Sequence, residues 1–411
     1  MRGQGVKPQR AAKEQMAKQQ ARQQVVMIGG GAVGSAIACF LLLDPKFTGQ
    51  VKVIERDPAY SKASSALSAS SIRQQFSTAV NVELSRFGIE FLRRAGDILS
   101  VNGECPEVGL REQGYLFLAS PAGAAALEEN HRLQTSLGAD TVLLAVDALH
   151  QRFPWLSTQG IALGSLGLSG EGWFDGYSLL QALRRKARSL GAEYLAAQAV
   201  GFACNADRIH SVRLADGSLL DCDIVVNAAG PWAREPAAWL GIELPVRARR
   251  RCVYVVNCPT RIDDAPLVID PSGVYFRPEG RGQFICGTSP EPADDPDDLP
   301  LEADPALFEY AVWPRLAARV PAFEALRQTS AWAGYYEYNT FDCNGIVGFH
   351  PGIRNFIFAN GFSGHGLQQS PAVGRGVAEL IVHGAYRTID LAPLAFERIA
   401  ANRPLLERNV V

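Results

Sequence analysis

The sequence has little net charge, because 42 Asp and Glu residues almost balance its 40 Lys and Arg residues. Such a chain has no overall field to attract nucleic acid or an anionic membrane, so we expect neither as a partner. The eight cysteines include no Cys-x-x-Cys pair and no cluster with histidine, which predicts that no metal is bound. Scattered, unpaired cysteines are typical of a reducing compartment, and we expect a cytoplasmic location.

The first 24 residues lack the apolar core of a secretory signal, and we expect a disordered basic extension over 1–24. This segment has six Lys and Arg residues, one acid and many glutamines. A basic, acid-poor segment also suits a mitochondrial presequence, which would place the protein on the matrix side. The absence of serine argues against that alternative.

Long hydrophobic runs are scarce as well. Residues 25–43 carry no charge, but they contain four glycines, which suit a turn better than a membrane-spanning helix. We therefore expect no membrane span. No internal repeat is visible, and 411 residues exceed one ordinary hydrophobic core, so the length predicts two domains.

A βαβ pattern typical of dinucleotide binding stands near the start of the chain. A short apolar strand runs into Gly29-x-Gly31-x-x-Gly34 and a helix, and a second strand, 51–54, ends at Glu55. Glu55 stands at the distance expected of a carboxylate that binds a ribose hydroxyl. Gly29 would form a tight turn, Gly31 would admit the pyrophosphate, and Gly34 would let helix and strand pack closely. The candidates for cofactor binding here are Gly29, Gly31, Ala32, Val33, Gly34, Glu55 and Arg56.

A loop of small residues, 61–71, follows this unit. Its small side chains and free amides would let it press against a phosphate or an isoalloxazine ring, with Ser64, Ser65 and Ser71 as candidate contacts. A flexible linker is the alternative. Arg73 comes directly behind the loop and is the best candidate for a cation that faces a substrate carboxylate, although a solvated surface arginine would fit the same pattern.

The middle of the chain alternates helical and strand patterns. Helices are predicted over 81–99, 178–190 and 305–328. A buried strand that begins at residue 223 ends in small residues, which suits a chain that passes close over a bound nucleotide. The candidates there are Ala228, Ala229, Gly230 and Trp232.

Residues 247–287 are rich in strands and predict one large antiparallel sheet. Tyr254, Tyr275 and Arg277 lie on it and could line a substrate pocket. Because side chains alternate along a strand, each could equally point away. The acidic, proline-rich segment 291–304 is predicted to be a solvated connector.

A second glycine-rich loop follows two strands near the end of the chain, and Pro371 is predicted to open the next helix. Backbone N–H groups at a helix start favour an electron-rich target, which in a flavoprotein is the pyrimidine edge of the ring. The loop therefore favours FAD, and a nicotinamide dehydrogenase leaves it unexplained. His365 could touch the flavin, be attached to it, or only bond to backbone. The candidate residues are Gly361, Phe362, Ser363, Gly364, His365, Gly366, Leu367 and Gln368.

Four motifs carry a family resemblance that covers residue 25 to about 395. The chain resembles the D-amino acid oxidase/sarcosine oxidase superfamily of FAD enzymes in the order and spacing of Gly29-x-Gly31-x-x-Gly34, Asn227-Ala228-Ala229-Gly230, Trp332-Ala333-Gly334 and Gly361 to Gly366. Within that superfamily it looks most like a branch linked to the assembly of respiratory complex I and like the bacterial relatives of that branch.

The resemblance implies an α/β fold, α+β overall, in which a Rossmann-type FAD-binding domain carries an inserted antiparallel-sheet substrate domain. It assigns 25–105, 165–245 and 330–411 to the discontinuous FAD-binding domain, and 106–164 and 246–329 to the substrate domain. It adds Val200 and Gly334 to the cofactor contacts. The implied reaction oxidises the C–N bond of an amine or of an N-methyl or D-amino acid, with hydride passing to flavin N5 and the imine hydrolysing.

Departures from the family pattern limit this transfer. The cysteine that tethers FAD in monomeric sarcosine oxidases maps to Trp332, which implies non-covalent FAD. Their oxygen-activating lysine falls at Ile285, which favours a dehydrogenase over an oxidase. Two positions at which relatives have a carboxylate-binding arginine or lysine are occupied here by the uncharged Tyr336 and Gln368. Only Arg73 matches a carboxylate contact of the relatives. We therefore expect a larger amine or a weakly held amino acid. Oxygen, a quinone and an electron-transfer protein stay open as the acceptor.

A second hypothesis is a flavoprotein that assembles or scaffolds a respiratory complex and whose FAD is structural. The likeness to the assembly-linked branch motivates it, and the segment 291–304 would be its docking surface. The enzyme is the leading hypothesis. Its candidate catalytic residues are Arg73, Tyr254, Tyr275, Arg277, Tyr336 and Gln368.

Overall fold

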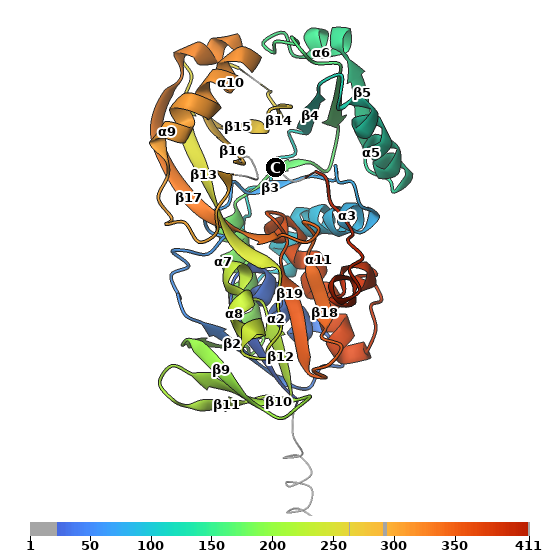
Figure 1. Cartoon of the computed structure of the whole chain (residues 1–411), viewed down its shortest axis with the longest axis vertical. Coiled ribbons are helices and arrows are strands. Elements are labelled where there is room, and N and C mark those ends of the chain that lie inside the picture. The colour runs from blue at the N-terminus through green and yellow to red at the C-terminus, as the bar shows by residue number, and fades with distance from the viewer. Residues whose placement is uncertain (1–22, 263, 291–293, 410–411) are drawn as a thin grey trace, which may run out of the picture.

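The computed structural model describes residues 23–262, 264–290 and 294–409, so the extension predicted over 1–24 lies almost wholly outside the described residues. Two large sheets carry the fold. In Figure 1 the six-stranded sheet lies in the lower half of the molecule and the eight-stranded sheet in the upper half.

The six-stranded sheet contains the predicted βαβ unit. Its neighbouring strands are parallel except β18, which runs antiparallel to β19. Side chains of β1 alternate, so that Val25 and Met27 pack into one core while Val26 and Ile28 pack into another. Both faces of the sheet are thereby buried, as is usual for parallel sheets. The strand order is β18 (Ile346–Phe349), β19 (Phe356–Asn360), β12 (Ile224–Asn227), β1 (Gln24–Ile28), β2 (Gln50–Glu55) and β8 (Glu193–Ala196).

Helices that include residues 32–43 and 366–383 cover one face of this sheet, and a small three-stranded sheet lies against the other, together with the helices at 234–238 and 397–400. The predicted helices over 81–99 and 178–190 are confirmed. No helix in the described ranges is long and apolar enough to cross a membrane. The helices are α2 (Ala32–Leu43), α3 (Ala79–Arg93), α4 (Ala95–Ile98), α7 (Gly176–Ser189), α8 (Arg234–Ala238), α11 (Gly366–His383) and α12 (Glu397–Ala400). The small sheet consists of β9 (Ala199–Cys204), β10 (Ile209–Leu214) and β11 (Leu219–Asp221).

The eight-stranded sheet confirms the large sheet expected around 247–287, with one difference. Its strands pair antiparallel except β14 and β4, which are parallel. The strand order is β17 (Arg327–Asn339), β13 (Val246–Asn257), β16 (Gln283–Thr288), β15 (Val274–Gly280), β14 (Leu267–Ile269), β4 (Tyr115–Ala119), β6 (Leu163–Gly167) and β5 (Thr141–Ala145). Further elements are α5 (Ala124–Ser136), α6 (Val146–Arg152), β3 (Ser71–Ile72) and β7 (Gly172–Trp173).

Two of the expected domain boundaries fall inside strands of this sheet. The boundary at 165 divides β6, and the boundary at 330 divides β17, which pairs with β13 along its whole length. Residues 330–339 therefore belong to the eight-stranded sheet, because their hydrogen-bond partners lie there. The division into two domains itself stays a prediction.

Pro371 does not open α11 as expected. The helix begins at Gly366, directly after the glycine loop, and Pro371 lies inside it. Proline lacks the N–H that would bond to the carbonyl of Leu367 four residues earlier. The Ser370 hydroxyl donates to that carbonyl oxygen at 2.9 Å instead, so the helix continues through the proline.

The helix predicted over 305–328 is interrupted. It consists of α9 (Pro305–Leu307), a π turn at Phe308–Val312, α10 (Trp313–Arg319) and a 3₁₀ turn at Pro321–Ala325. Proline at the start of α9 and of the last turn fixes these boundaries, because it cannot continue a preceding helix.

The described part of the acidic segment, 294–304, connects β16 to α9 and is mostly exposed, as expected of a solvated connector, but ion pairs also hold it in place. Asp295 is only 8% exposed, and its two oxygens pair with the Arg251 guanidinium at 2.8 Å each. Asp297 pairs with Arg249 at 2.7 Å, and Asp298 pairs with Arg234 at 2.8 Å. The arginines of β13 thus hold this segment against the sheet.

Candidate functional site

A cavity of about 940 Å³ is lined by both large sheets. The carboxyl ends of β1 and β2 place Gly29 and Glu55 in its wall, and the eight-stranded sheet contributes Arg251, Tyr275 and Tyr336. Doubly wound α/β sheets bind ligands at the carboxyl ends of their strands. The cavity therefore joins a nucleotide-type site to a pocket on the second sheet.

The first glycine motif has the geometry that its spacing predicts. Gly29 has a φ of +101°, and a Cβ there would overlap the Ala228 carbonyl. A Cβ at Gly34 would overlap the Gly29 carbonyl oxygen, so Gly34 lets α2 pack closely on β1. Gly31 borders the cavity, where a Cβ would meet only Ser65 Oγ, at 3.7 Å. The backbone at Gly31 is thus open to a ligand.

Glu55 lies at the end of β2, as expected. Its Oε2 accepts a hydrogen bond from Gly30 N, and its Oε1 accepts one from Asp57 N, both at 2.8 Å. Burial raises the pKa of this carboxyl, and the two bonds partly offset that effect. The Arg56 guanidinium lies 4.2 Å from the Trp232 ring centre, on the same cavity wall. These groups suit the nucleoside end of a dinucleotide.

Side chains of the eight-stranded sheet hold the loop of small residues in place, so the loop is not a flexible linker. Trp332 Nε1 donates to the Leu67 carbonyl oxygen at 2.9 Å, and Arg277 Nη2 donates to the Ala69 carbonyl oxygen at the same distance. A Cβ at Gly334 would lie 2.9 Å from Leu67 Cβ, so glycine is needed where the loop crosses β17. Arg277 therefore orients the loop and does not line the cavity.

The second glycine loop ends at the start of α11, also on the cavity. Gly364 has a φ of +93°, and a Cβ there would overlap the Tyr336 ring. Gly364, Gly366 and Leu367 line the cavity. Their position at a helix N-terminus supplies N–H donors and the positive end of a helix dipole.

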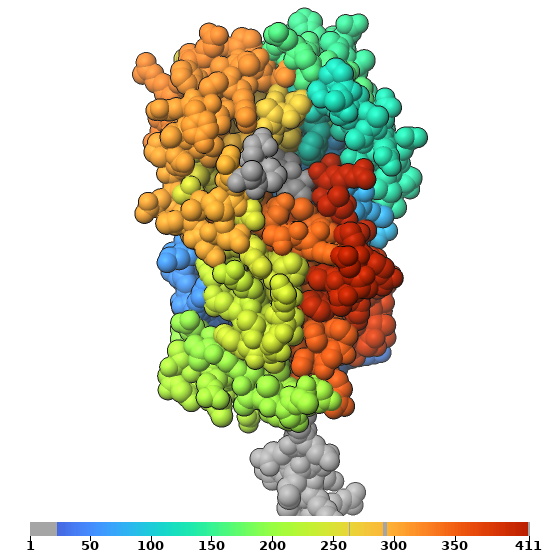
Figure 2. Space-filling view, in the orientation of Figure 1, coloured from blue at the N-terminus to red at the C-terminus, as the bar shows by residue number. Residues whose placement is uncertain are grey.

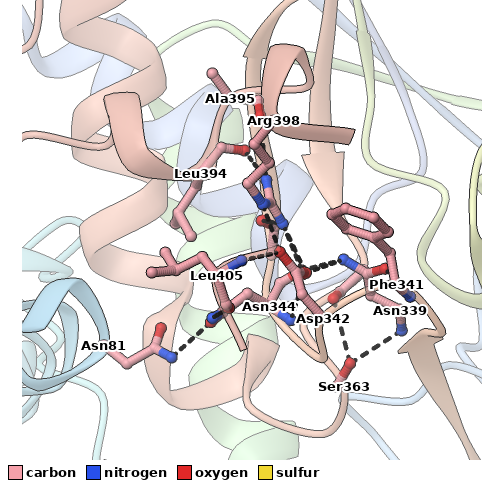
Figure 3. Close-up of polar contacts among 12 residues, drawn as sticks. Asn81, Asn339, Phe341, Asp342, Asn344, Ser363, Leu394, Ala395, Arg398 and Leu405 are labelled. Carbon is pink, nitrogen blue, oxygen red and sulfur yellow. Dashed lines mark hydrogen bonds and ion pairs between the residues drawn. The ribbon is translucent and has the colours of Figure 1, made fainter. Parts of the chain in front are cut away.

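A buried polar network supports this loop from behind, as Figure 3 shows. Asp342 and Arg398 form an ion pair through two contacts, at 2.7 and 3.0 Å. Asn339 donates to Asp342 Oδ1 from its side chain, at 2.9 Å, and to Ser363 Oγ from its backbone N, also at 2.9 Å. Ser363 holds a left-handed φ of +51°. The network thus fixes a strained turn of the second glycine loop.

Glu337 is a cavity residue that the sequence analysis missed. Its side chain lines the cavity, and its Oε2 accepts a hydrogen bond from Gly361 N at 3.0 Å. Burial raises the pKa of this carboxyl to about 8. An acid within the aromatic sequence Tyr335, Tyr336 and Tyr338 was the signal that could have identified it.

Arg73 is buried, with 3% of its surface exposed, so the surface alternative is wrong. Its backbone N donates to Gln368 Oε1 at 2.9 Å, and its Nη2 lies 3.1 Å from His365 Nε2. The guanidinium lies 4.5 Å from the Phe76 ring centre. Burial and the Arg73 charge hold the pKa of His365 well below its usual range, so that imidazole is neutral. Arg73, His365 and Gln368 thus lie together, just behind the cavity wall.

The last described residues close the outer side of Arg73. The Asn409 backbone carbonyl accepts a hydrogen bond from Arg73 Nη2. Glu407, 1% exposed, accepts bonds from Ser77 N, Thr78 Oγ1 and other donors at the start of α3, and so holds this segment in place. Figure 2 shows the end of the chain, in red, packed beside the teal residues of α5.

Two predicted residues point elsewhere. Tyr254 lies on the face of β13 opposite Arg251 and Val253; its ring packs 5.1 Å from Phe308, and its hydroxyl donates to the Asp304 carbonyl oxygen at 2.5 Å. Strand alternation thus turns it into the core of the eight-stranded sheet. Val200 is 40% exposed, while Ala199 beside it lines the cavity.

The cavity brings together most of the predicted residues. Those that line it are Gly29, Gly31, Ala32, Val33, Glu55, Arg56, Ser64, Ser65, Ala228, Ala229, Gly230, Trp232, Tyr275, Gly334, Tyr336, Gly364, Gly366 and Leu367. Those that do not are Gly34, Ser71, Arg73, Val200, Tyr254, Arg277, Gly361, Phe362, Ser363, His365 and Gln368. Besides Glu337, the missed lining residues include Tyr60, Leu67, Arg251 and Val253. Within the described ranges, no group of three His, Cys, Asp or Glu side chains is placed to hold a metal.

Comparison with known families identifies this architecture. The family model of FAD dependent oxidoreductases matches residues 24–380. The chain belongs to this family. It is 44% identical over 424 residues to FAD-dependent oxidoreductase domain-containing protein 1 of Xenopus laevis, covering 95% of this chain and 85% of that protein.

More distant relatives have named substrates. Mitochondrial dimethylglycine dehydrogenase of Homo sapiens is 26% identical over 396 residues, which cover 90% of this chain and 44% of that protein. The crystal structure of L-proline dehydrogenase from P. horikoshii superposes with a TM-score of 0.82 at 26% identity, covering 93% of this chain and 99% of that one. The family implies FAD, and the open backbone at Gly31, the carboxylate of Glu55 and the amides at Gly366 fit that cofactor.

Proposed function

We propose that this protein oxidises the C–N bond of an amine, or of an N-methyl or D-amino acid, with FAD held non-covalently in the cavity. The single observation that carries the proposal is the continuity of the cavity. It runs from the first glycine motif, past the amides at the start of α11, to an aromatic wall formed by Tyr275 and Tyr336. The names of the dimethylglycine and L-proline dehydrogenases support a substrate of this class.

The cofactor, when bound, supplies the acceptor for a hydride from the carbon beside the nitrogen. The residues of the chain position the cofactor and the substrate and polarise them. The amides of Gly366 and Leu367, at the positive end of α11, would favour negative charge on a cofactor group bound beside them. Tyr275 and Tyr336 exclude water from the reacting side. Burial raises the pKa of both phenols, so they stay neutral at ordinary pH.

The carboxylate-binding role of Arg73 remains part of the proposal. Its Nη2 already contacts His365 and the Asn409 carbonyl, so a substrate carboxylate that binds at Nη2 has to displace the Asn409 carbonyl. Arg251 lines the cavity, but its guanidinium is paired with Asp295. A substrate with a weakly held carboxylate, or a larger amine without one, fits this arrangement.

We propose a dehydrogenase rather than an oxidase. The position of the oxygen-activating lysine of sarcosine oxidases is occupied here by Ile285, which is 2% exposed. Without a cation at that position, a quinone or an electron-transfer protein is the expected acceptor.

A role in assembling a respiratory complex has less support. Its proposed docking surface was the acidic segment, and Asp295, Asp297 and Asp298 are paired with arginines of this same chain. The enzyme accounts for the cavity, whereas the scaffold does not require one.

The visible spectrum of the purified protein tests the proposal. We expect a flavin band that bleaches on anaerobic addition of sarcosine, dimethylglycine or L-proline. A bound flavin that no amine reduces would overturn the enzymatic proposal in favour of the assembly role. Absence of flavin from a folded preparation would overturn the cofactor site.

A further inference from the structure

The Glu337 side chain lies between Gly230, after β12, and the second glycine loop, which includes Gly361 and Gly366. Its Oε2 bonds to Gly361 N at 3.0 Å, and a Cβ at Gly366 would lie 2.8 Å from its Oε1. A Cβ at Gly230, which follows β12, would lie 4.0 Å from its Oε2. Glycine at 366 therefore leaves room for this carboxyl group, which reaches the cavity between the end of β12 and the start of α11.

No cation neutralises this carboxyl among the described residues. Its neighbour on β13 is Ala248, and the flanking Arg247 and Arg249 form ion pairs with Asp297 instead. The second glycine loop offers only the uncharged backbone of Gly361 and Phe362. His365, the next titratable group along that loop, is neutral and faces Arg73. On the cavity side Tyr336 keeps its proton, because burial raises its pKa.

Asp342 is a buried acid that does not line the cavity, and its environment differs from that of Glu337. Asp342 has no exposed surface, and it is matched by Arg398 through two contacts at 2.7 and 3.0 Å. Burying a carboxyl without such a partner costs free energy, which favours its neutral form. The pKa of Glu337, raised to about 8, expresses this cost. A neutral carboxyl is both a donor and an acceptor, and this one borders the cavity.

We propose that the Glu337 carboxyl binds FAD directly, by a hydrogen bond to a polar atom of the flavin half of the cofactor, and that its protonation state sets the pH dependence of flavin reduction. This inference rests on the proposed cofactor site but not on the proposed substrate. A neutral acid tolerates the negative charge that reduction places on the ring, whereas a carboxylate opposes it. Reduction should therefore draw a proton onto Glu337 at alkaline pH.

The midpoint potential of the flavin, measured against pH in the holoprotein, tests this directly. Wild-type protein should show a steeper fall of potential above about pH 8 than Glu337→Gln, which is neutral at every pH. Glu337→Ala should weaken FAD binding about tenfold, because it removes the hydrogen bond. Glu171→Gln is the matched control, since Glu171 is buried with a raised pKa but does not line the cavity.

Equal slopes in wild type and Glu337→Gln would overturn the inference. If Glu337→Gln does not fold, the wild-type protein alone gives a second test. Its oxidised flavin spectrum should shift with an apparent pKa between about 7 and 9, and a spectrum that is constant over that range would overturn the inference. Both readouts use chemical or electrochemical reduction. A flavin that ignores amines but titrates as expected would therefore overturn the proposed reaction and support the role of Glu337.

Discussion

The backbone carbonyl of Asn409 accepts a hydrogen bond from the guanidinium of Arg73, 336 positions earlier in the chain. The residue best placed by sequence to hold a substrate carboxylate is thus already in contact with the end of the described chain. Glu407 keeps that segment in place at the start of α3, where the helix dipole favours its negative charge. We call residues 407–409 the clamp, and we expect it to limit access to Arg73 Nη2.

Replacement of Arg73 tests whether it binds substrate at all. We expect Arg73→Ala to raise the KM for a carboxylated amine by about tenfold or more, because it removes a charge-assisted hydrogen bond. The KM for an amine without a carboxylate should not change. Steady-state kinetics with both substrates check this, and Arg94→Ala, which changes an exposed arginine, is the control. An unchanged KM for the carboxylated amine would remove Arg73 from the substrate site.

Release of the clamp should have the opposite effect. Glu407→Ala removes the bonds to Ser77 and Thr78, so the Arg73 donor should be free for a larger fraction of the time. We expect the KM for a carboxylated amine to fall by about fivefold, since the competent state becomes more populated. The exposed acid in Glu397→Ala is the matched control. Faster hydrogen exchange near residues 405–409 with no change in KM would contradict the gating role.

Substitution of Gly34 should abolish cofactor binding. A Cβ at Gly34 would overlap the Gly29 carbonyl oxygen, so Gly34→Ala has to push α2 away from β1 and distort the first glycine motif. The ratio of flavin to protein absorbance should fall to a small fraction of the wild-type value. Gly201→Ala is the control, because a Cβ there meets nothing within 4 Å. Full flavin content in Gly34→Ala would show that this contact can relax.

Glu171 should make stability depend on pH. Burial raises its pKa to about 7, although Gln74 N and Gln75 Nε2 donate to it at 2.6 and 2.8 Å. The folded state therefore holds a proton that the unfolded state loses near pH 4.5. The free energy of unfolding should then fall as pH rises from about 4.5 to 7, and this contribution should level off above pH 7. Urea titrations at several pH values should show that the free energy of unfolding declines less with rising pH in Glu171→Gln than in the wild type.

The sequence predicted the parts of the site that rest on local geometry. Gly29, Gly34 and Glu55 stand in one βαβ unit, whose spacing is set by a single strand, turn and helix. Tyr275 and Tyr254 show the limit of such reasoning. Both lie on strands of the same sheet, but alternation places Tyr275 on the cavity and turns Tyr254 into the core, and only the register of the strands decides between them.

The parts that could not be predicted depend on contacts between distant segments. Nothing near Arg73 in the sequence indicates that Asn409 reaches it, because that contact is set by the path of the last residues over α3. Glu337 escaped notice for a similar reason, since its importance comes from Gly361 and Gly366 on another segment. The prediction that Pro371 opens a helix was wrong, because the hydroxyl of the neighbouring Ser370 replaces the hydrogen bond that proline cannot make.

The acidic segment has one more consequence. Pro300, Leu301 and Glu302 form part of the cavity wall, and the same segment is tied to β13 by ion pairs of Asp295 and Asp297. A dinucleotide in the cavity would lie against this segment, which both ion pairs and hydrogen bonds to its backbone carbonyls hold in place. Salt screens the more exposed Asp297 pair far more than the buried Asp295 pair, so we expect the ionic strength of the buffer to weaken only part of this attachment.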